Sequence, residues 1–262
     1  MPYARSGSHD VWWSAEGSGS PILLINGLSS PSAVWFRLVP LLASHHRVLT
    51  MDNLGTGKTG VPQEPWTMAD MATAAADVIR AAGEERASVL GISMGGLIAQ
   101  ELTLEHPKLV TALVLVATHA GIAHASGDPD AAAAIMSAGS LPSKERLKVI
   151  MPFTYAHASE ADVAEDEAVR SAHPTSEEGY KGQLAAVGPF DRLSELHRIA
   201  CPTLVLHGEQ DRLVHASSAQ QLAETIPGAE FVVLPDTGHQ LFTDQPASGA
   251  EVVLRFLKDK VS

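Results

Sequence analysis

A glycine-rich turn between an apolar run and a helix-forming segment constrains the fold of this chain most strongly. Residues 89–92 are apolar and partly β-branched, and they lead through Gly91-Ile92-Ser93-Met94-Gly95-Gly96 into a segment that carries Leu, Ile, Ala and Gln. This pattern predicts a strand, a sharp turn and a helix. At such a turn the backbone of the serine is strained, its hydroxyl stands clear of the sheet, and glycines are the residues that fit beside it. Ser93 is therefore a candidate nucleophile, although a purely structural turn in a parallel sheet gives the same pattern.

Two later strand patterns end in residues that could activate a serine. Residues 199–208 have the pattern of a buried strand, and Asp211 lies just past its end. Residues 231–234 have a second strand pattern, and His239 lies in the turn that follows it. We expect both side chains near Ser93, because the carboxyl ends of parallel strands meet at one edge of a sheet. Nucleophile, acid and histidine then occur in the chain order of one known type of catalytic triad.

Several motifs together make the sequence similar to the α/β-hydrolase family. They are the turn around Ser93, His207-Gly208-Glu209-Gln210-Asp211, Thr237-Gly238-His239, Asn26-Gly27 and Asp52-Asn53-Leu54-Gly55-Thr56-Gly57. The resemblance extends over about residues 10 to 260 and is weakest between about 120 and 192. The family often has His-Gly where this chain has Asn26-Gly27, and often an arginine where it has Leu54.

Alternation of strand and helix patterns predicts the architecture. Apolar runs of strand length occur at 22–25, 47–52, 87–92 and 112–117, with helical patterns between them. Such alternation indicates an α/β fold with a doubly wound, mostly parallel sheet. Between residues 121 and 192 interrupted helical patterns replace strands, and by the resemblance this insertion is a helical cap. We expect one α/β-hydrolase core of residues 1–120 and 193–262, with the cap at 121–192.

The proposed chemistry gives each member of the triad a role. A serine hydroxyl is too weakly acidic to attack a carbonyl unaided, so His239 would take its proton and later give it to the leaving group. Asp211 would orient the imidazole and stabilise its charged form. Asp52 and Asp236 also follow strand patterns, and either remains an alternative to Asp211.

Other candidate site residues flank the turn or lie in the insertion. By the resemblance, the backbone N–H groups of Leu28 and Met94 form an oxyanion hole. The remaining candidates for substrate contact are Asn26, Gly27, His119, Met136, Phe153 and Tyr155, with His124 as a further possibility at the cap entrance. Packing between cap and core is an alternative role for Met136, Phe153 and Tyr155.

Composition excludes several classes of partner. The formal charge of −12, from 30 acidic and 18 basic residues, repels phosphate backbones and anionic membrane surfaces.

No histidine, cysteine or carboxylate spacing is typical of a metal site, and we expect neither a metal nor a cofactor. The single cysteine, Cys201, cannot form an internal disulfide. Residues 1–6 lack the apolar core of a signal peptide, so we expect a cytoplasmic location. The oligomeric state stays open.

A serine nucleophile narrows the reaction to acyl transfer. The resemblance is strongest to carboxylesterases and enol-lactonases, which implies cleavage of an ester or lactone of a small, largely apolar molecule. A cofactor-free perhydrolase or haloperoxidase and a carbon–carbon bond hydrolase share the same triad and are alternatives. A small-molecule receptor on a hydrolase scaffold is an alternative of another class.

Overall fold

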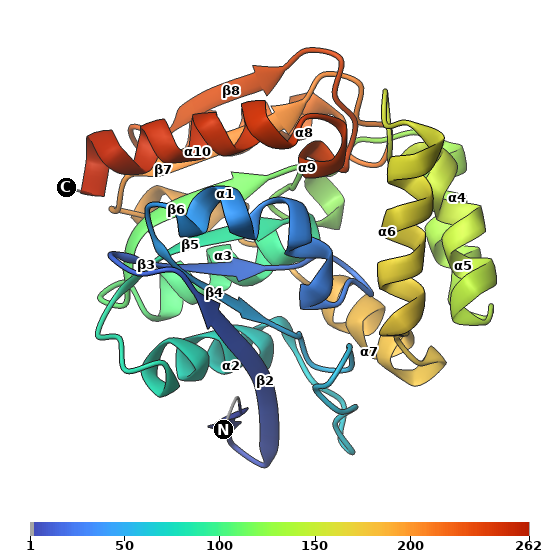
Figure 1. The fold of residues 1–262 in the computed structure, drawn as a ribbon, viewed down its shortest axis with the longest axis horizontal. Coiled ribbons are helices and arrows are strands. Elements are labelled where there is room, and N and C mark those ends of the chain that lie inside the picture. Colours follow the sequence, from blue (N-terminus) through green and yellow to red (C-terminus); the bar gives the residue numbers. More distant parts are fainter. Residues whose placement is uncertain (1–2, 262) are drawn as a thin grey trace.

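Eight strands form one sheet in the computed structural model, which describes residues 3–261 (Figure 1). Met1, Pro2 and Ser262 lie outside this range. The prediction that residues 1–6 lack the apolar core of a signal peptide therefore lies partly outside the described residues. The strands are β1 (Tyr3–Ser6), β2 (His9–Glu16), β3 (Pro21–Ile25), β4 (Arg47–Met51), β5 (Ala87–Ile92), β6 (Val110–Val116), β7 (Thr203–Gly208) and β8 (Glu230–Leu234). Their spatial order is β1-β2-β4-β3-β5-β6-β7-β8. Only β1 and β2 run antiparallel to their neighbours, which confirms the predicted mostly parallel α/β sheet.

Helices cover both faces of the sheet and give it two hydrophobic cores. One face carries α2 (Met68–Ala81), α3 (Met94–Glu105) and α8 (Ala216–Thr225). The other carries α1 (Val39–Ala43), α9 (Leu241–Asp244) and α10 (Pro246–Val261). Strands β5 and β7 are buried along their whole length, as the continuous apolar runs predict for strands covered on both sides.

Local sequence signals explain how two of these helices begin. The Thr67 hydroxyl accepts from the Asp70 N–H, and the Asp70 carboxylate accepts from the Thr67 N–H, so α2 starts with a capping box. Trp35, Phe36, Val39 and Leu42 have helical spacing, but instead of one helix they lie in a 3₁₀ segment, η1 (Ser32–Arg37), and the short α1. Pro40 lacks an N–H and so cannot continue a helix from the preceding turn, but it fits the first turn of α1.

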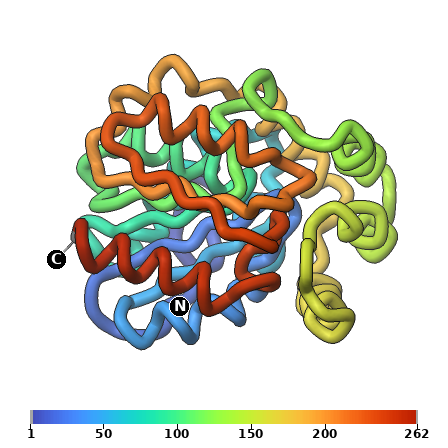
Figure 2. Tube along the Cα trace, turned by 90° about the horizontal axis from the view of Figure 1, so that it is seen from above, coloured from blue at the N-terminus to red at the C-terminus, as the bar shows by residue number. Residues whose placement is uncertain are grey.

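The insertion between β6 and β7 is helical. It contains η2 (Ile122–His124), α4 (Pro129–Ala138), α5 (Ser143–Ile150), η3 (Met151–Phe153), α6 (Glu160–Ala172) and α7 (Glu177–Val187), and η4 (Leu193–Arg198) follows it. In Figures 1 and 2 the green to yellow helices α4–α6 stand together beyond one end of the sheet. We propose that residues 121–192 act as the cap of an active site at that end.

The two ends of the insertion are joined to each other. Gly121 and Asp191 form an isolated antiparallel bridge, and the Arg192 N–H donates to the Ala120 carbonyl at 3.0 Å. Arg192 also donates two hydrogen bonds, of 2.6 and 2.7 Å, to the buried carboxylate of Glu101 on α3. The chain therefore leaves and re-enters the core at a single anchored point.

None of the helices within residues 3–261 has the length and apolar character needed to cross a bilayer.

Candidate active site

The turn between β5 and α3 has the strained geometry that its sequence predicts. Ser93 has φ 55° and ψ −122°, in the left-handed half of conformational space that L-residues rarely occupy. A Cβ atom on Gly91 would lie 2.2 Å from the Gly95 carbonyl oxygen, and one on Gly95 would lie 2.1 Å from the Ile25 oxygen. Both glycines are therefore required for the close approach of strand, turn and helix that holds Ser93 in place.

His239 and Asp211 meet at the carboxyl ends of β7 and β8. The distance from His239 Nδ1 to Asp211 Oδ2 is 2.7 Å, and both residues are buried. The other carboxylate oxygen, Oδ1, accepts from the N–H groups of Leu213 and Val214 at 2.9 and 3.0 Å. Since a carboxylate only accepts hydrogen bonds, His239 carries a proton on Nδ1 and leaves Nε2 free to accept another.

Two opposing effects act on the Asp211 carboxyl. Burial alone raises its pKa, but the charge of His239 and hydrogen bonds from His207 and His239 outweigh burial. The net result is a pKa well below the ordinary value for aspartate. Asp211 is therefore ionised at every pH at which a histidine changes its charge.

His207 is a neighbour of the pair that the sequence did not single out. It is fully buried on β7, and its Nε2 lies 2.7 Å from the Val214 carbonyl and 3.3 Å from Asp211 Oδ2. Its position four residues before Asp211 was the available signal, but a histidine within an apolar strand run does not reveal which way it points. The contact places a second imidazole against the carboxylate that orients His239.

The loop after β3 lies directly against the turn. A Cβ atom on Gly27 would lie 3.1 Å from that of Ser93. The Asn26 side chain donates to the Pro31 carbonyl at 2.9 Å, so it closes the loop. Among residues 3–261, the N–H groups of Leu28 and Met94 have no hydrogen-bond partner, and Met94 begins α3, where helical N–H groups are free.

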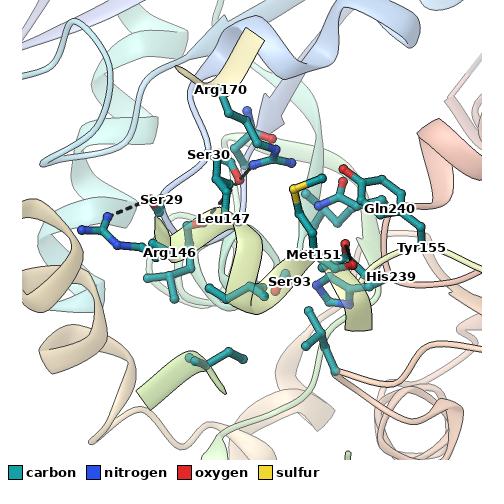
Figure 3. Close-up of a pocket in the computed structure, with 18 of the residues that line it drawn as sticks. Ser29, Ser30, Ser93, Arg146, Leu147, Met151, Tyr155, Arg170, His239 and Gln240 are labelled. Atoms are coloured by element: carbon teal, nitrogen blue, oxygen red, sulfur yellow. Dashed lines mark hydrogen bonds between the residues drawn. The ribbon is translucent and has the colours of Figure 1, made fainter. Parts of the chain in front are cut away.

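A cavity of about 130 Å³ lies between this loop, the turn and the insertion (Figure 3). Ser93 and His239 both line it. Its apolar lining consists of Leu28, Ile92, Ile135, Leu147, Ile150, Met151 and Leu213. Two arginines, Arg146 of α5 and Arg170 of α6, also line the cavity. Neither was predicted as a site residue from the sequence. An arginine in a polar helix normally faces solvent, and burial of these two depends on how the cap folds.

The alternative acids lie apart from His239. The Asp52 carboxylate accepts from the N–H groups of Ser32 and Lys58, each at 2.7 Å, and so holds two loops together. The side chain of Asp236 is 69% exposed and accepts from Gln210 at 3.2 Å. Of the three aspartates, Asp211 is the one that contacts His239.

The predicted substrate contacts from the insertion fall into two groups. Tyr155 lines the cavity, as Asn26 and Gly27 do, and its hydroxyl donates to Asp166 at 3.0 Å. Burial raises the pKa of Tyr155 above its ordinary value. Met136, by contrast, is 71% exposed and lies outside the cavity lining.

Phe153, His119 and His124 also lie outside the cavity lining. The Phe153 ring packs under the guanidinium of Arg212, 4.8 Å from Cζ to the ring centre. His119 Nδ1 accepts from the Gly121 N–H at 3.1 Å, and burial lowers the pKa of His119 to about 4. His124 pairs with Asp191 at the base of the insertion. We therefore leave these residues and Met136 out of the proposed substrate contacts.

No cluster of three or more histidine, cysteine or acidic side chains in the described part of the chain could hold a metal ion.

Comparisons with known proteins agree on one family. The family model described as the alpha/beta hydrolase fold matches residues 20–246. A protein named "Putative carbamate hydrolase RutD" from Azorhizobium caulinodans is 30% identical, over 98% of this chain and 98% of that protein. A solved hydrolase from Pseudomonas aeruginosa PA01 has a TM-score of 0.85 and 29% identity, with 97% of each chain covered.

A second solved structure extends the likeness in fold. The enol-lactonase from Burkholderia xenovorans LB400 has a TM-score of 0.86 and 24% identity, over 98% of this chain and all of that one. The matched family model covers most of the chain, from before the Ser93 turn to beyond His239. This protein therefore belongs to the α/β-hydrolase family.

Proposed function

We propose that this protein is a serine hydrolase that cleaves a carboxylic ester or lactone of a small, largely apolar molecule through an acyl-enzyme. One observation carries the proposal: His239, which is joined to Asp211 at 2.7 Å, lines the same small cavity as the strained Ser93. A histidine oriented by a carboxylate beside an exposed hydroxyl is the arrangement that activates a serine toward a carbonyl. The relative named as a carbamate hydrolase makes carbamates a useful comparison substrate.

The reaction proceeds in two acyl transfers. Ser93 Oγ attacks the carbonyl carbon while its proton passes to Nε2 of His239, and the carbonyl oxygen gains negative charge. The N–H groups of Leu28 and Met94 donate to that oxygen. The ester C–O bond then breaks, and His239 returns the proton to the leaving alcohol. Water then attacks the acyl carbon while His239 takes its proton. The bond from the acyl carbon to Ser93 Oγ breaks, His239 returns the proton to Oγ, and the acid is released.

The cavity size predicts a preference for short acyl groups. A cavity of about 150 Å³ holds one benzene molecule, and this one is about 130 Å³. Because each surplus methylene in a filled pocket costs about tenfold or more, we expect kcat/KM for p-nitrophenyl acetate or butyrate to exceed that for octanoate by at least about tenfold. Initial rates with the ester series test this. An optimum at octanoate would show that the cap opens further than the cavity suggests.

Activity is expected to fall as the solution is acidified from pH 8 to 5. A histidine base works only while neutral, and histidines ordinarily gain a proton in this range. Asp211 does not contribute to the fall, because its pKa is held below the ordinary value, and His119 stays neutral with a pKa of about 4. The measurement is kcat/KM against pH with p-nitrophenyl acetate. A profile that is flat from pH 5 to 8, with chemistry limiting, would contradict a histidine base.

The lowered pKa of Asp211 also determines how its contribution to the free energy of unfolding depends on pH. A carboxyl whose pKa is lower in the folded protein stabilises the fold above its unfolded value of about 3.9. That contribution is lost as the pH falls below this value toward the pKa of folded Asp211. The contribution of Asp211 to the free energy of unfolding should therefore be constant from pH 8 to 5, so protonation of Asp211 does not destabilise the fold in the range where activity is expected to fall.

A further inference from the structure

Two buried guanidinium groups line the cavity without a carboxylate to pair with. Arg146 is 2% exposed and Arg170 is 9% exposed, and both residues line the cavity that Ser93 and His239 share. Within residues 3–261, neither forms an ion pair. No aspartate or glutamate lines the cavity, although acidic residues outnumber basic ones in the chain as a whole.

The buried acidic residue of α6 that lies nearest to Arg170 is already engaged. Asp166 lies one turn before Arg170, but its Oδ1 pairs with Arg37 at 3.3 Å. Its Oδ2 accepts from the hydroxyls of Tyr155 and Thr243 at 3.0 and 2.7 Å. The Asp166 carboxylate is therefore directed toward other groups. Glu167, three residues before Arg170 and half-buried, forms no ion pair with it among the described residues.

The two arginines differ in how much of their hydrogen-bonding capacity is used. Arg146 donates to the carbonyls of Ala138, Leu141 and Thr175 at 3.1–3.3 Å and lies over the Tyr180 ring, 4.2 Å from Cζ to the ring centre. Burial is the main effect that lowers the pKa of Arg146. Arg170 donates to Ser30 Oγ at 2.6 Å and also interacts with the Tyr155 hydroxyl, which leaves part of the five N–H groups of its guanidinium unused.

Both arginines contact the same turn beside the proposed oxyanion hole. Arg170 bonds to Ser30, and Arg146 Nη1 lies 3.5 Å from Ser29 Oγ. Figure 3 shows Ser29 and Arg146 on the side of Ser93 opposite His239, and Ser30 and Arg170 above both of them. Because His239 must lie beside the leaving group to protonate it, we assign the part of the cavity at Ser29 and Ser30 to the acyl group.

Burying a charge without a partner is costly, and a ligand of opposite charge offsets that cost. A carboxylate accepts two parallel hydrogen bonds from one guanidinium, which matches the unused donors of Arg170. On the basis of the proposed function, we propose that the substrate is an ester or lactone whose acyl part carries a second carboxylate, which Arg170 binds while Arg146 adds positive potential. The substrate class is thus the monoester, or the corresponding lactone, of a short dicarboxylic acid.

A matched pair of esters tests the proposal. Monomethyl succinate and methyl 4-methylpentanoate have the same shape, with a carboxylate in the first where the second has an isopropyl group. Hydrolysis is followed by proton release at constant pH in the wild type, Arg170→Met, Arg170→Lys and the control Arg80→Met. Arg80 lies on α2 with its side chain 52% exposed, far from the cavity lining.

We expect the wild type to favour the anionic ester. Arg170→Met should lower kcat/KM for monomethyl succinate about 10- to 100-fold, mostly through KM, as for loss of a hydrogen bond to a charged group. It should change the value for the neutral ester by less than about threefold, with Arg170→Lys between the two and Arg80→Met unchanged. A wild type that prefers the neutral ester would overturn the proposal, as would an equal loss on both esters.

A binding measurement separates this inference from the proposed function. Succinate should raise the melting temperature of the wild type and of Ser93→Ala, whereas neutral succinamide should not, and Arg170→Met should abolish the shift. Hydrolysis of neither ester together with a succinate shift would refute the esterase function and leave the anion site standing. Hydrolysis without a shift that depends on Arg170 would refute the anion site alone.

Since Arg170 is buried and forms no ion pair, Arg170→Met should melt no lower than the wild type without ligand. A lower melting temperature would instead assign Arg170 a structural role.

Discussion

Replacing Ser93 with alanine is expected to lower kcat by about 10⁶-fold, the loss seen when a triad enzyme is deprived of its serine nucleophile. The substitution removes only the hydroxyl, and alanine carries the same Cβ into the turn, so the cavity and the His239–Asp211 pair should persist. A residual rate above that in water should remain, because the oxyanion donors and substrate binding are intact. The measurement is kcat for p-nitrophenyl acetate with highly purified variant.

The matched control is Ser194→Ala. Ser194 is an exposed serine in η4, outside the cavity lining, and its loss should leave kcat unchanged. Circular dichroism and the melting temperature should match between the two variants. Near-normal turnover by Ser93→Ala would remove Ser93 from the reaction and with it the acyl-enzyme mechanism.

Replacing Asp211 with asparagine is expected to lower kcat by about 10⁴-fold through the wrong histidine tautomer. Oδ1 of Asp211 accepts from two backbone N–H groups, so an asparagine would place its carbonyl there and turn its NH₂ toward His239. Nδ1 of His239 would then have to accept, and the ring proton would move to Nε2. An Nε2 that already carries a proton cannot take one from Ser93.

Asp236→Asn is the control for this prediction. It makes the same chemical change at an exposed aspartate that follows the neighbouring strand, and it should leave kcat within about twofold, as surface substitutions away from a site usually do. A pH profile of Asp211→Asn adds a second readout, since a tautomer defect should be partly relieved at high pH, when a base other than His239 can act. An unchanged rate for Asp211→Asn would make Asp211 structural and reopen the choice of acid.

The core of the fold and the position of the candidate triad follow from local sequence rules. Parallel strands that are buried on both faces require continuous apolar runs, so the sequence alone predicts β5 and β7. Residues placed just past such strands meet at one sheet edge, which brings Asp211 and His239 together. The turn at Ser93 is legible because only glycine fits against the backbone at Gly91 and Gly95.

The interior of the cap could not be predicted by the same rules. Short helices with small or polar residues pack in ways that periodicity does not determine, so Met136 faces solvent and Phe153 stacks against Arg212. Arg170 shows the difficulty most clearly. Its helix α6 is rich in acidic residues and looks solvated, and only the tertiary contact of α6 with the loop at Ser30 buries the guanidinium.

The bridge between Gly121 and Asp191 has a consequence for how this enzyme could change over evolution. Because the insertion departs and returns at adjacent backbone positions, the sheet does not depend on the length of what lies between them. Helices could be lengthened, lost or exchanged there while Ser93, Asp211 and His239 keep their places. Selection could then act on the insertion, where we propose that substrate is recognised, independently of the proposed triad.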